Sequence, residues 1–155
     1  MNMSKQNFQF DYCANIASIE ALKHVSAPPS DGLKIIAHIA GTSELWLARV
    51  SGNEPSLEAW PTIQLIDLPF VLTLQRDRWL SLADQYSDSS PIDYMTRSGV
   101  SVVNTFAEIG QEVLLHSAHH RGQIALLLRQ SAFEPPTSTD YIPMLRKMPI
   151  SDTIR

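Results

Sequence analysis

One segment decides how this sequence folds, and it reads Leu114-Leu115-His116-Ser117-Ala118-His119-His120-Arg121-Gly122-Gln123. It lies in a stretch of helix-forming residues that starts after Thr105 and ends near Ser131. Thr105 and Glu108 have the spacing of a capping box, in which the two residues bond reciprocally to each other's backbone. The segment therefore belongs to a long helix near the C-terminal end of the fold.

The apolar spacing of this helix places two of its histidines on the face that should be buried. Spacings of three and four predict a core-facing stripe of Phe106, Ile109, Val113, His116, His120 and Leu127. A polar group buried without a partner costs about 1–3 kcal/mol. Histidines four residues apart share one helix face, so both rings can bind one metal ion at about 2.0–2.1 Å. A hydrogen-bonded core pair, or a solvated pair, is the alternative interpretation.

A third histidine lies in an equally apolar helical segment. His38 interrupts the run Ile35-Ile36-Ala37-His38-Ile39-Ala40. It is the best further ligand for a site with His116 and His120, and a lone core histidine is the alternative. His24 stays outside the site, because a histidine at the end of a helix suits the helix dipole.

Three further helices are expected before the quoted segment. They are expected over residues 8–24, over residues 32–50, and from residue 67 until the polar stretch 84–91. Ser30 or Asp31 is the expected cap of the second helix, and Asp67 that of the third. Gly52 is the expected left-handed residue at the end of the second helix.

The connection between the third and fourth helices has a different pattern. Residues 92–103 combine strand-favouring side chains with the turn signal Ser98-Gly99, which predicts a short β-hairpin or extended crossover. Residues 133–155 hold four prolines and are expected to form a tail over the bundle rather than another long helix. The expected fold class is all-α, a four-helix bundle in one domain over residues 1–155, with the helix directions left open.

Composition argues against several kinds of protein. The apolar fraction of 44% and charged fraction of 18% are typical of a globular domain rather than a disordered chain. The formal charge is −4 and the basic residues are scattered, so nucleic acid and anionic membranes are not expected partners. No apolar run approaches the ~18 residues of a membrane span. Cys13 is the only cysteine, which favours a reducing cytoplasm as the compartment.

The residues from His116 to Gln123 resemble the helix-four signature of the DinB/YfiT-like superfamily. Other matching stretches are Ala37 to Ala40, Glu44 to Leu47 with Gly52, Tyr12 with Asn15, Pro135-Pro136, and Asp140 to Ile142. The resemblance implies a four-helix bundle with a metal, typically zinc or nickel, bound by His38, His116 and His120. It also implies a tendency to form homodimers. The family includes S-transferases and isomerases that use low-molecular-weight thiols, and many members have no known activity.

The residues themselves leave the activity open between two classes of protein. Three imidazoles leave coordination positions free, as in catalytic metal sites, so the first hypothesis is a metal-dependent thiol S-transferase or hydrolase acting on a small molecule. The alternative is a non-catalytic stress-response or binding protein with a structural or sensory metal. Glu112, one turn before His116, is the candidate catalytic base, against the alternative of a solvated side chain. His119, Arg121 and Gln123 are candidates for contacts that support the ligands.

Overall fold

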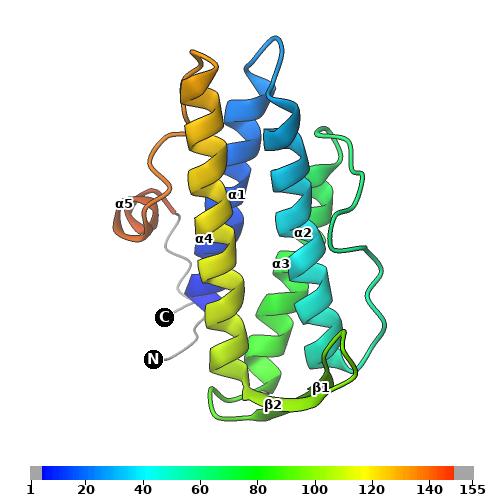
Figure 1. The fold of residues 1–155 in the computed structure, drawn as a ribbon. Helices are drawn as coiled ribbons and strands as arrows, with labels where there is room; N and C mark the ends of the chain where they lie inside the picture. The colour runs from blue at the N-terminus through cyan, green and yellow to red at the C-terminus, as the bar shows by residue number, and fades with distance from the viewer. Residues whose placement is uncertain (1–4, 149–155) are drawn as a thin grey trace.

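The computed structural model describes residues 5–148, which form a mostly helical domain with one small antiparallel sheet (Figure 1). Its elements are α1 (Lys5–Lys23), α2 (Ser30–Ser51), α3 (Leu68–Gln85), β1 (Pro91–Met95), β2 (Ser101–Thr105), α4 (Phe106–Gln130) and α5 (Tyr141–Lys147). The four long helices expected from the sequence are present, with boundaries that differ by a few residues. No helix within residues 5–148 is long and apolar enough to cross a membrane.

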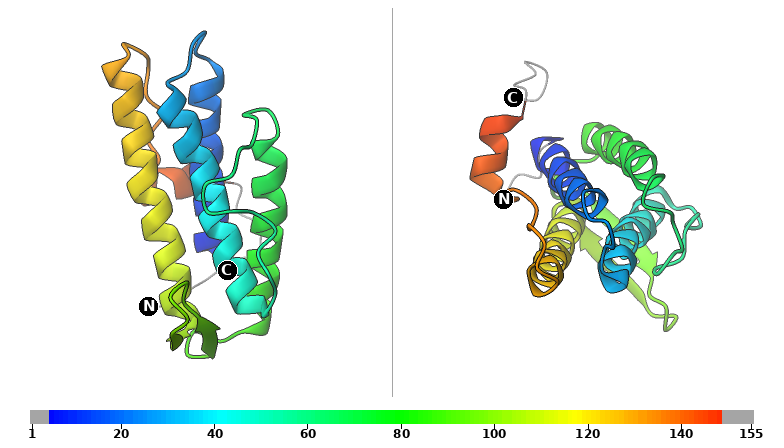
Figure 2. Two further views of the ribbon diagram at one scale, coloured as in Figure 1. Left: turned by 45° about the vertical axis from the view of Figure 1, so that its right-hand side comes forward. Right: turned by 90° about the horizontal axis from the view of Figure 1, so that it is seen from above.

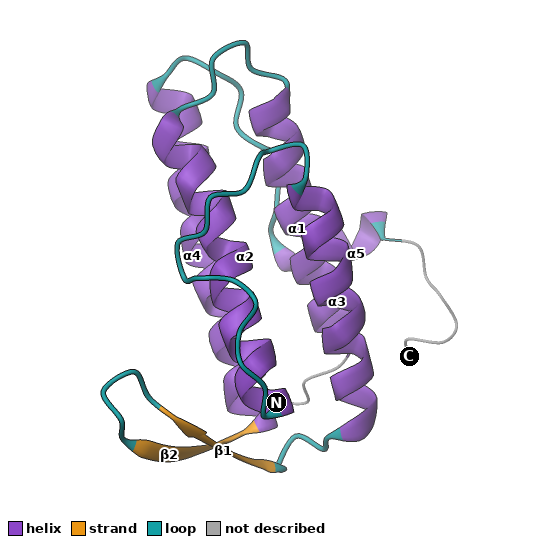
Figure 3. Cartoon of the chain, turned by 90° about the vertical axis from the view of Figure 1, so that its right-hand side faces the viewer, coloured by secondary structure: helices purple, strands orange, loops and turns teal. Residues whose placement is uncertain are grey.

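The four long helices lie side by side, and their order around the axis is not their order in the chain. α1 and α2 each pack against both α3 and α4, as the view from above shows (Figure 2). α1 and α4 run in one direction, and α2 and α3 run in the other (Figure 1). This arrangement requires the segment 53–67 to travel back along the length of α2 before α3 begins (Figure 3). The middle of α2 therefore lies against an antiparallel α4, with the returning segment beside it.

The β-hairpin closes one end of the helices and confirms the prediction for residues 92–103. β1 and β2 pair antiparallel, with Ile92 opposite Asn104 and Tyr94 opposite Val102. Ile92 is buried in the same apolar cluster as Trp79 and Phe106. The hairpin thus continues the core at this end instead of standing away from it (Figure 1).

Two of the predicted helix ends are confirmed, the predicted cap of α2 is wrong, and Asp67 occupies the N-cap position of α3 without a side-chain capping bond. The Thr105 side chain accepts from the Glu108 backbone, and the Glu108 carboxylate accepts from the Thr105 backbone, which completes the capping box. Gly52 ends α2 with φ of 66°, a left-handed conformation that glycine adopts without strain. The predicted caps of α2 and α3 make no capping hydrogen bond, because α2 already starts at residue 30 after Pro29, and Asp67 has helical backbone angles.

The predicted core stripe of the fourth helix is correct only in its first half. Phe106, Ile109 and Val113 are buried, but the buried face then continues through Ser117, Arg121, Ile124 and Leu128. His116 and His120 are half-buried rather than buried. The reason is that α4 packs against two helices: the residues after each histidine face α1, and the histidines face α2.

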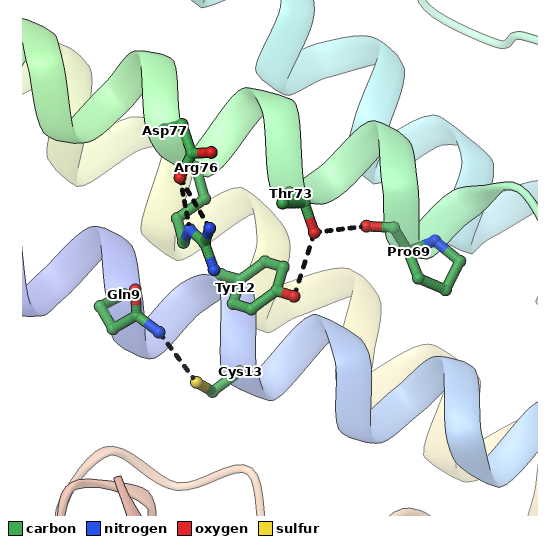
Figure 4. A network of polar contacts seen from close by, with 7 residues as sticks. All are labelled: Gln9, Tyr12, Cys13, Pro69, Thr73, Arg76 and Asp77. Carbon is green, nitrogen blue, oxygen red and sulfur yellow. Dashed lines mark hydrogen bonds and ion pairs between the residues drawn. The ribbon is translucent and has the colours of Figure 1, made fainter. Parts of the chain in front are cut away.

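Polar contacts between side chains join α1 to α3 (Figure 4). The Tyr12 hydroxyl lies 3.1 Å from Thr73 Oγ1, and the Arg76 guanidinium stacks 4.5 Å from the centre of the Tyr12 ring. Cys13 Sγ accepts a hydrogen bond from Gln9, and burial raises the pKa of this thiol. The only cysteine therefore lies on α1 as a protonated packing residue.

The tail beyond α4 agrees with its prediction. Its one helix, α5, has seven residues and packs on α1 (Figure 2). The Tyr141 ring contacts Phe10 edge-on, with ring centres 4.8 Å apart. Residues 149–155, which the prediction included, lie outside the described part of the chain.

Candidate metal centre

Three histidines from two helices meet in the structure. The nearest ligand atoms of His38, His116 and His120 all lie within 4.8 Å of one another. Their ring centres are 4.4–5.0 Å apart, with the rings steeply inclined to one another. His38 is 9% exposed, whereas the two histidines of α4 are half-buried. The packing of α2 against α4 thus joins residues that are about half the chain apart.

The two histidines of α4 point the same ring atom at each other. Their Nε2 atoms are 3.1 Å apart. Two nitrogen ligands on a tetrahedral zinc ion, each at about 2.0–2.1 Å, are separated by about 3.3 Å. The observed separation is therefore close to the spacing that one shared metal ion imposes.

Hydrogen bonds at the far side of two rings select the nitrogen that remains free. His38 Nδ1 donates to the Ala59 carbonyl oxygen at 2.6 Å, and His120 Nδ1 donates to Gln123 Oε1 at 2.6 Å. These partners accept only, so they assign the proton to Nδ1 and leave a lone pair on Nε2. Metal-binding histidines in proteins generally have such a partner on the second ring nitrogen.

The segment 58–61 holds His38 from outside the helix pair. Besides the Ala59 carbonyl, it supplies Trp60, whose ring stacks on the His38 ring with centres 3.7 Å apart and planes inclined by 7°. The backbone of this segment lies directly on α2 at Gly41. A Cβ atom there would be 2.7 Å from the Ala59 carbonyl oxygen and 2.8 Å from Pro61, and closer still to the Glu58 carbonyl oxygen. Only glycine at position 41 therefore permits this contact.

The sequence prediction missed this segment. A glycine inside a helix, three residues after a candidate ligand, was the one signal for a close backbone approach. Nothing in the sequence marked the carbonyl of Ala59, because any residue supplies the same group.

The other predicted site residues have different positions. Gln123 contacts His120 through its Oε1, and its amide Nε2 lies 3.1 Å from His119 Nε2 on the exposed side of α4. Glu112 is exposed, lines a small groove with Trp46, and is not part of the histidine cluster. Arg121 is buried and faces α1, where it pairs with Asp11.

Burial and the neighbouring histidines lower the pKa of two of the three rings, His116 and His38. Burial, with the neighbouring histidines, lowers the pKa of His116 to about 4. Burial also lowers the pKa of His38, against the opposing effect of the Ala59 carbonyl. Neutral imidazole is the form that binds metal ions, so these two rings are ready to bind at neutral pH.

These observations fit a bound divalent transition metal. The donor set is three imidazoles, two of them with Nε2 freed by a hydrogen bond at Nδ1. His120 Nε2 is left with a lone pair, so without a metal the His116 Nε2–H can donate to it across the 3.1 Å separation, and a metal ion held by both rings would replace that proton. Within residues 5–148, no carboxylate or cysteine joins the cluster. The site defines a class of protein, helical with a cluster of three histidines that could hold a metal ion between two antiparallel helices.

Comparison with known families places the chain more narrowly. The sequence model of the DinB superfamily matches residues 33–124, more than half of the chain, and all three histidines lie inside the match. The protein belongs to the DinB superfamily. No curated protein matches the chain.

Proposed function

We propose that this protein is a metal-dependent enzyme built on the four-helix bundle of the DinB superfamily, with His38, His116 and His120 as its metal ligands. The observation that carries the proposal is the number of ligands. Three donors converge, and no fourth His, Cys, Asp or Glu within the described residues completes the shell. Structural zinc sites are usually closed by four protein ligands, whereas catalytic sites have three and an open position.

A metal ion with an open coordination position is a Lewis acid, and it lowers the pKa of a water or thiol that binds at that position. This favours a thiol S-transferase or a hydrolase as the type of enzyme. Zinc or nickel is the proposed metal, because imidazole suits borderline transition ions and the hard ions Mg²⁺ and Ca²⁺ need oxygen ligands.

The surroundings of Trp60 support a small-molecule substrate. A cavity of about 900 Å³ lies between the C-terminal half of α2, the segment 53–60 and the tip of the hairpin. Trp60 and Ala59 line this cavity and also contact His38, so the same two residues border both the cavity and the proposed metal centre. A volume of this size is typical of ligand sites. A low-molecular-weight thiol is the proposed co-substrate. Glu112, which lines the small groove that also contains Trp46, is the candidate catalytic base.

The proposal includes a homodimer in a reducing cytoplasm, and no nucleic-acid or membrane partner. Several large apolar side chains are exposed, among them Trp60 at 58% and Phe70 at 69%, and a second copy could cover some of them. Sedimentation at micromolar concentration tests the dimer, and a monomer of 17 kDa would contradict it.

The test of the function is metal analysis of the purified protein, followed by a screen for thiol conjugation and ester hydrolysis with zinc-loaded and nickel-loaded samples. We expect one metal per chain, and turnover that the His116→Ala variant loses and the His24→Ala variant keeps. One tightly bound metal without turnover of any electrophile or ester would instead support the structural or sensory alternative.

A further inference from the structure

A buried polar network joins α4 to α1 beside the metal centre. Arg121 is 2% exposed, and its Nη1 donates to Asp11 Oδ1 at 2.6 Å and to Asn15 Oδ1 at 2.9 Å. Asn15 Nδ2 donates to Asp11 Oδ2 at 3.0 Å, and the Ser117 hydroxyl also bonds to the Asp11 carboxylate. Both oxygens of Asp11 are thus used, and the four side chains fix one arrangement of the two helices.

The two α4 members of this network each follow a proposed ligand directly in the sequence. Ser117 follows His116, and Arg121 follows His120. Consecutive helical residues differ by 100° in direction and by 1.5 Å along the axis. Any rotation or sliding of α4 against α1 therefore moves the two histidines by a similar amount relative to His38.

Apolar packing alone is a poor means of fixing this part of α4. The histidines are half-buried, and the core-facing positions at their level are occupied by Ser117 and Arg121 rather than by large apolar side chains. Metal–ligand distances in protein sites stay within about 0.2 Å of their usual values, so the ligands must be placed accurately. A directional contact that fixes both the rotation of α4 about its axis and its position along that axis is needed here more than elsewhere in the core.

Stability does not account for the ion pair. Buried pairs often contribute no more than apolar residues of similar volume, because removing two charges from water offsets their attraction. Arg121 Nε is buried without a hydrogen-bond partner in the described part of the chain, which adds a further free-energy cost to the pair. A pair selected for stability alone would be expected to satisfy this group.

We propose that Asp11, Asn15 and Arg121 are positioning residues, which set the rotation and height of α4 so that His116 and His120 meet His38 at metal-binding distance. This inference rests on the proposed metal site and adds residues from a helix that contributes no ligand. It predicts that the network can be removed with the fold intact but the metal affinity reduced.

The experiment replaces the charged pair with apolar residues in the full chain, as the double variant Asp11→Leu/Arg121→Met. Two measurements are made: the melting temperature of the metal-free protein, and the Zn²⁺ affinity by competition with a chromophoric chelator. We expect a melting temperature within a few degrees of the original protein, and Zn²⁺ binding weakened at least tenfold. The absorption spectrum of the Co²⁺-loaded variant should also change, because it reports the geometry of the ligands.

A conservative variant and a matched control complete the design. Arg121→Lys keeps the charge but cannot make the same two hydrogen bonds, so we expect an intermediate Zn²⁺ affinity. Gln75→Leu removes another buried interhelical hydrogen bond, from α3 to the Ala40 carbonyl, and should leave Zn²⁺ affinity within about twofold.

The outcomes separate this inference from the proposed function. If the original protein binds no Zn²⁺, the proposed metal site fails, and the positioning role falls with it. The positioning role is wrong if the original protein binds Zn²⁺ and the double variant binds it equally well. If the double variant does not fold, Arg121→Lys takes its place in this comparison. An equal loss in Gln75→Leu would show that any loosened core weakens the site, and would also overturn the inference.

Discussion

The two helices that supply the histidines hold them in different ways. α4 carries two of the proposed ligands one turn apart, so the helix itself sets their spacing, and Gln123 on the next turn fixes one ring. α2 carries a single histidine, which is oriented by the segment 58–61, 21 residues further along the chain. A ligand pair within one helix is thus largely encoded locally, whereas a lone ligand depends on a distant contact. Substitutions far from any donor should therefore affect His38 most.

The largest expected effect is the loss of a ligand from either helix. Replacing His38, His116 or His120 with alanine removes one donor of three and should reduce Zn²⁺ affinity by at least a hundredfold, measured by chelator competition. His24→Ala and His119→Ala are the controls, because His24 is exposed at the end of α1 and His119, whose ring lies 5.1 Å from that of His120, adds no donor atom to the cluster. If His38→Ala kept one tightly bound metal per chain, the centre would belong to α4 alone.

The next prediction tests the contact between His38 and the segment 58–61 by a substitution at Gly41, a residue that supplies no metal-binding atom. Gly41→Ala places a methyl group where the backbone of the segment 58–61 lies, so the Ala59 carbonyl must move away from His38 Nδ1. Loss of such a supporting hydrogen bond typically costs about 10–100-fold in metal affinity. We expect a loss in this range, with quenched or shifted Trp60 fluorescence as an independent sign that the stacking has changed.

Gly122→Ala is the matched control, because a Cβ at this position on α4 meets nothing within 4 Å. It should stabilise the helix by about 0.5–1 kcal/mol and leave metal affinity unchanged. Equal metal affinity in the Gly41→Ala variant would show that His38 does not need the segment 58–61.

Prediction from the sequence succeeded where the signal was local. The capping box at Thr105, the left-handed Gly52 and the hairpin all depend on residues close together in the chain, and all three are confirmed. The histidines were found because they interrupt apolar helical stripes. Their proximity across α2 and α4 is also observed.

The failures have a common physical cause, which is packing between distant elements. The stripe of α4 was extended through its histidines because periodicity cannot show that the helix has two neighbours. Contact with α1 instead buries Ser117 and Arg121 and leaves the histidines at the edge. The hydrogen bond from His38 to the Ala59 carbonyl could not be predicted for a similar reason, since this backbone group reaches His38 only because the chain returns along α2.

A smaller effect is expected on the α4 side of the comparison. Gln123→Leu removes the acceptor that holds the proton on His120 Nδ1, so the ring can rotate or change its tautomer. The neighbouring ligand His116 still fixes the helix spacing, so we expect a loss of about tenfold or less in Zn²⁺ affinity. His119→Ala removes the contact of the same amide on the exposed side and an edge-on ring contact with His120, but no acceptor for His120 Nδ1, and should leave Zn²⁺ affinity within about twofold. A loss larger than that of Gly41→Ala would reverse the comparison between the two helices.

The smallest effect concerns the stability of the metal-free protein as the pH falls. Burial lowers the pKa of His116 to about 4 in the folded state, whereas an unfolded histidine has a pKa of about 6.5. The folded state therefore binds fewer protons between these values, and its stability should be complete above pH 6.5 and decline towards pH 4. The pKa of His38 is lowered in the same direction, so its contribution has the same sign. Because His116 is only half-buried, solvent screening should limit the decline.

Chemical denaturation of chelator-treated protein at several pH values measures this decline in stability, and His116→Gln should make the decline shallower. An equally steep decline in that variant would show that His116 is not the group responsible, and that other titrating groups dominate the acid response.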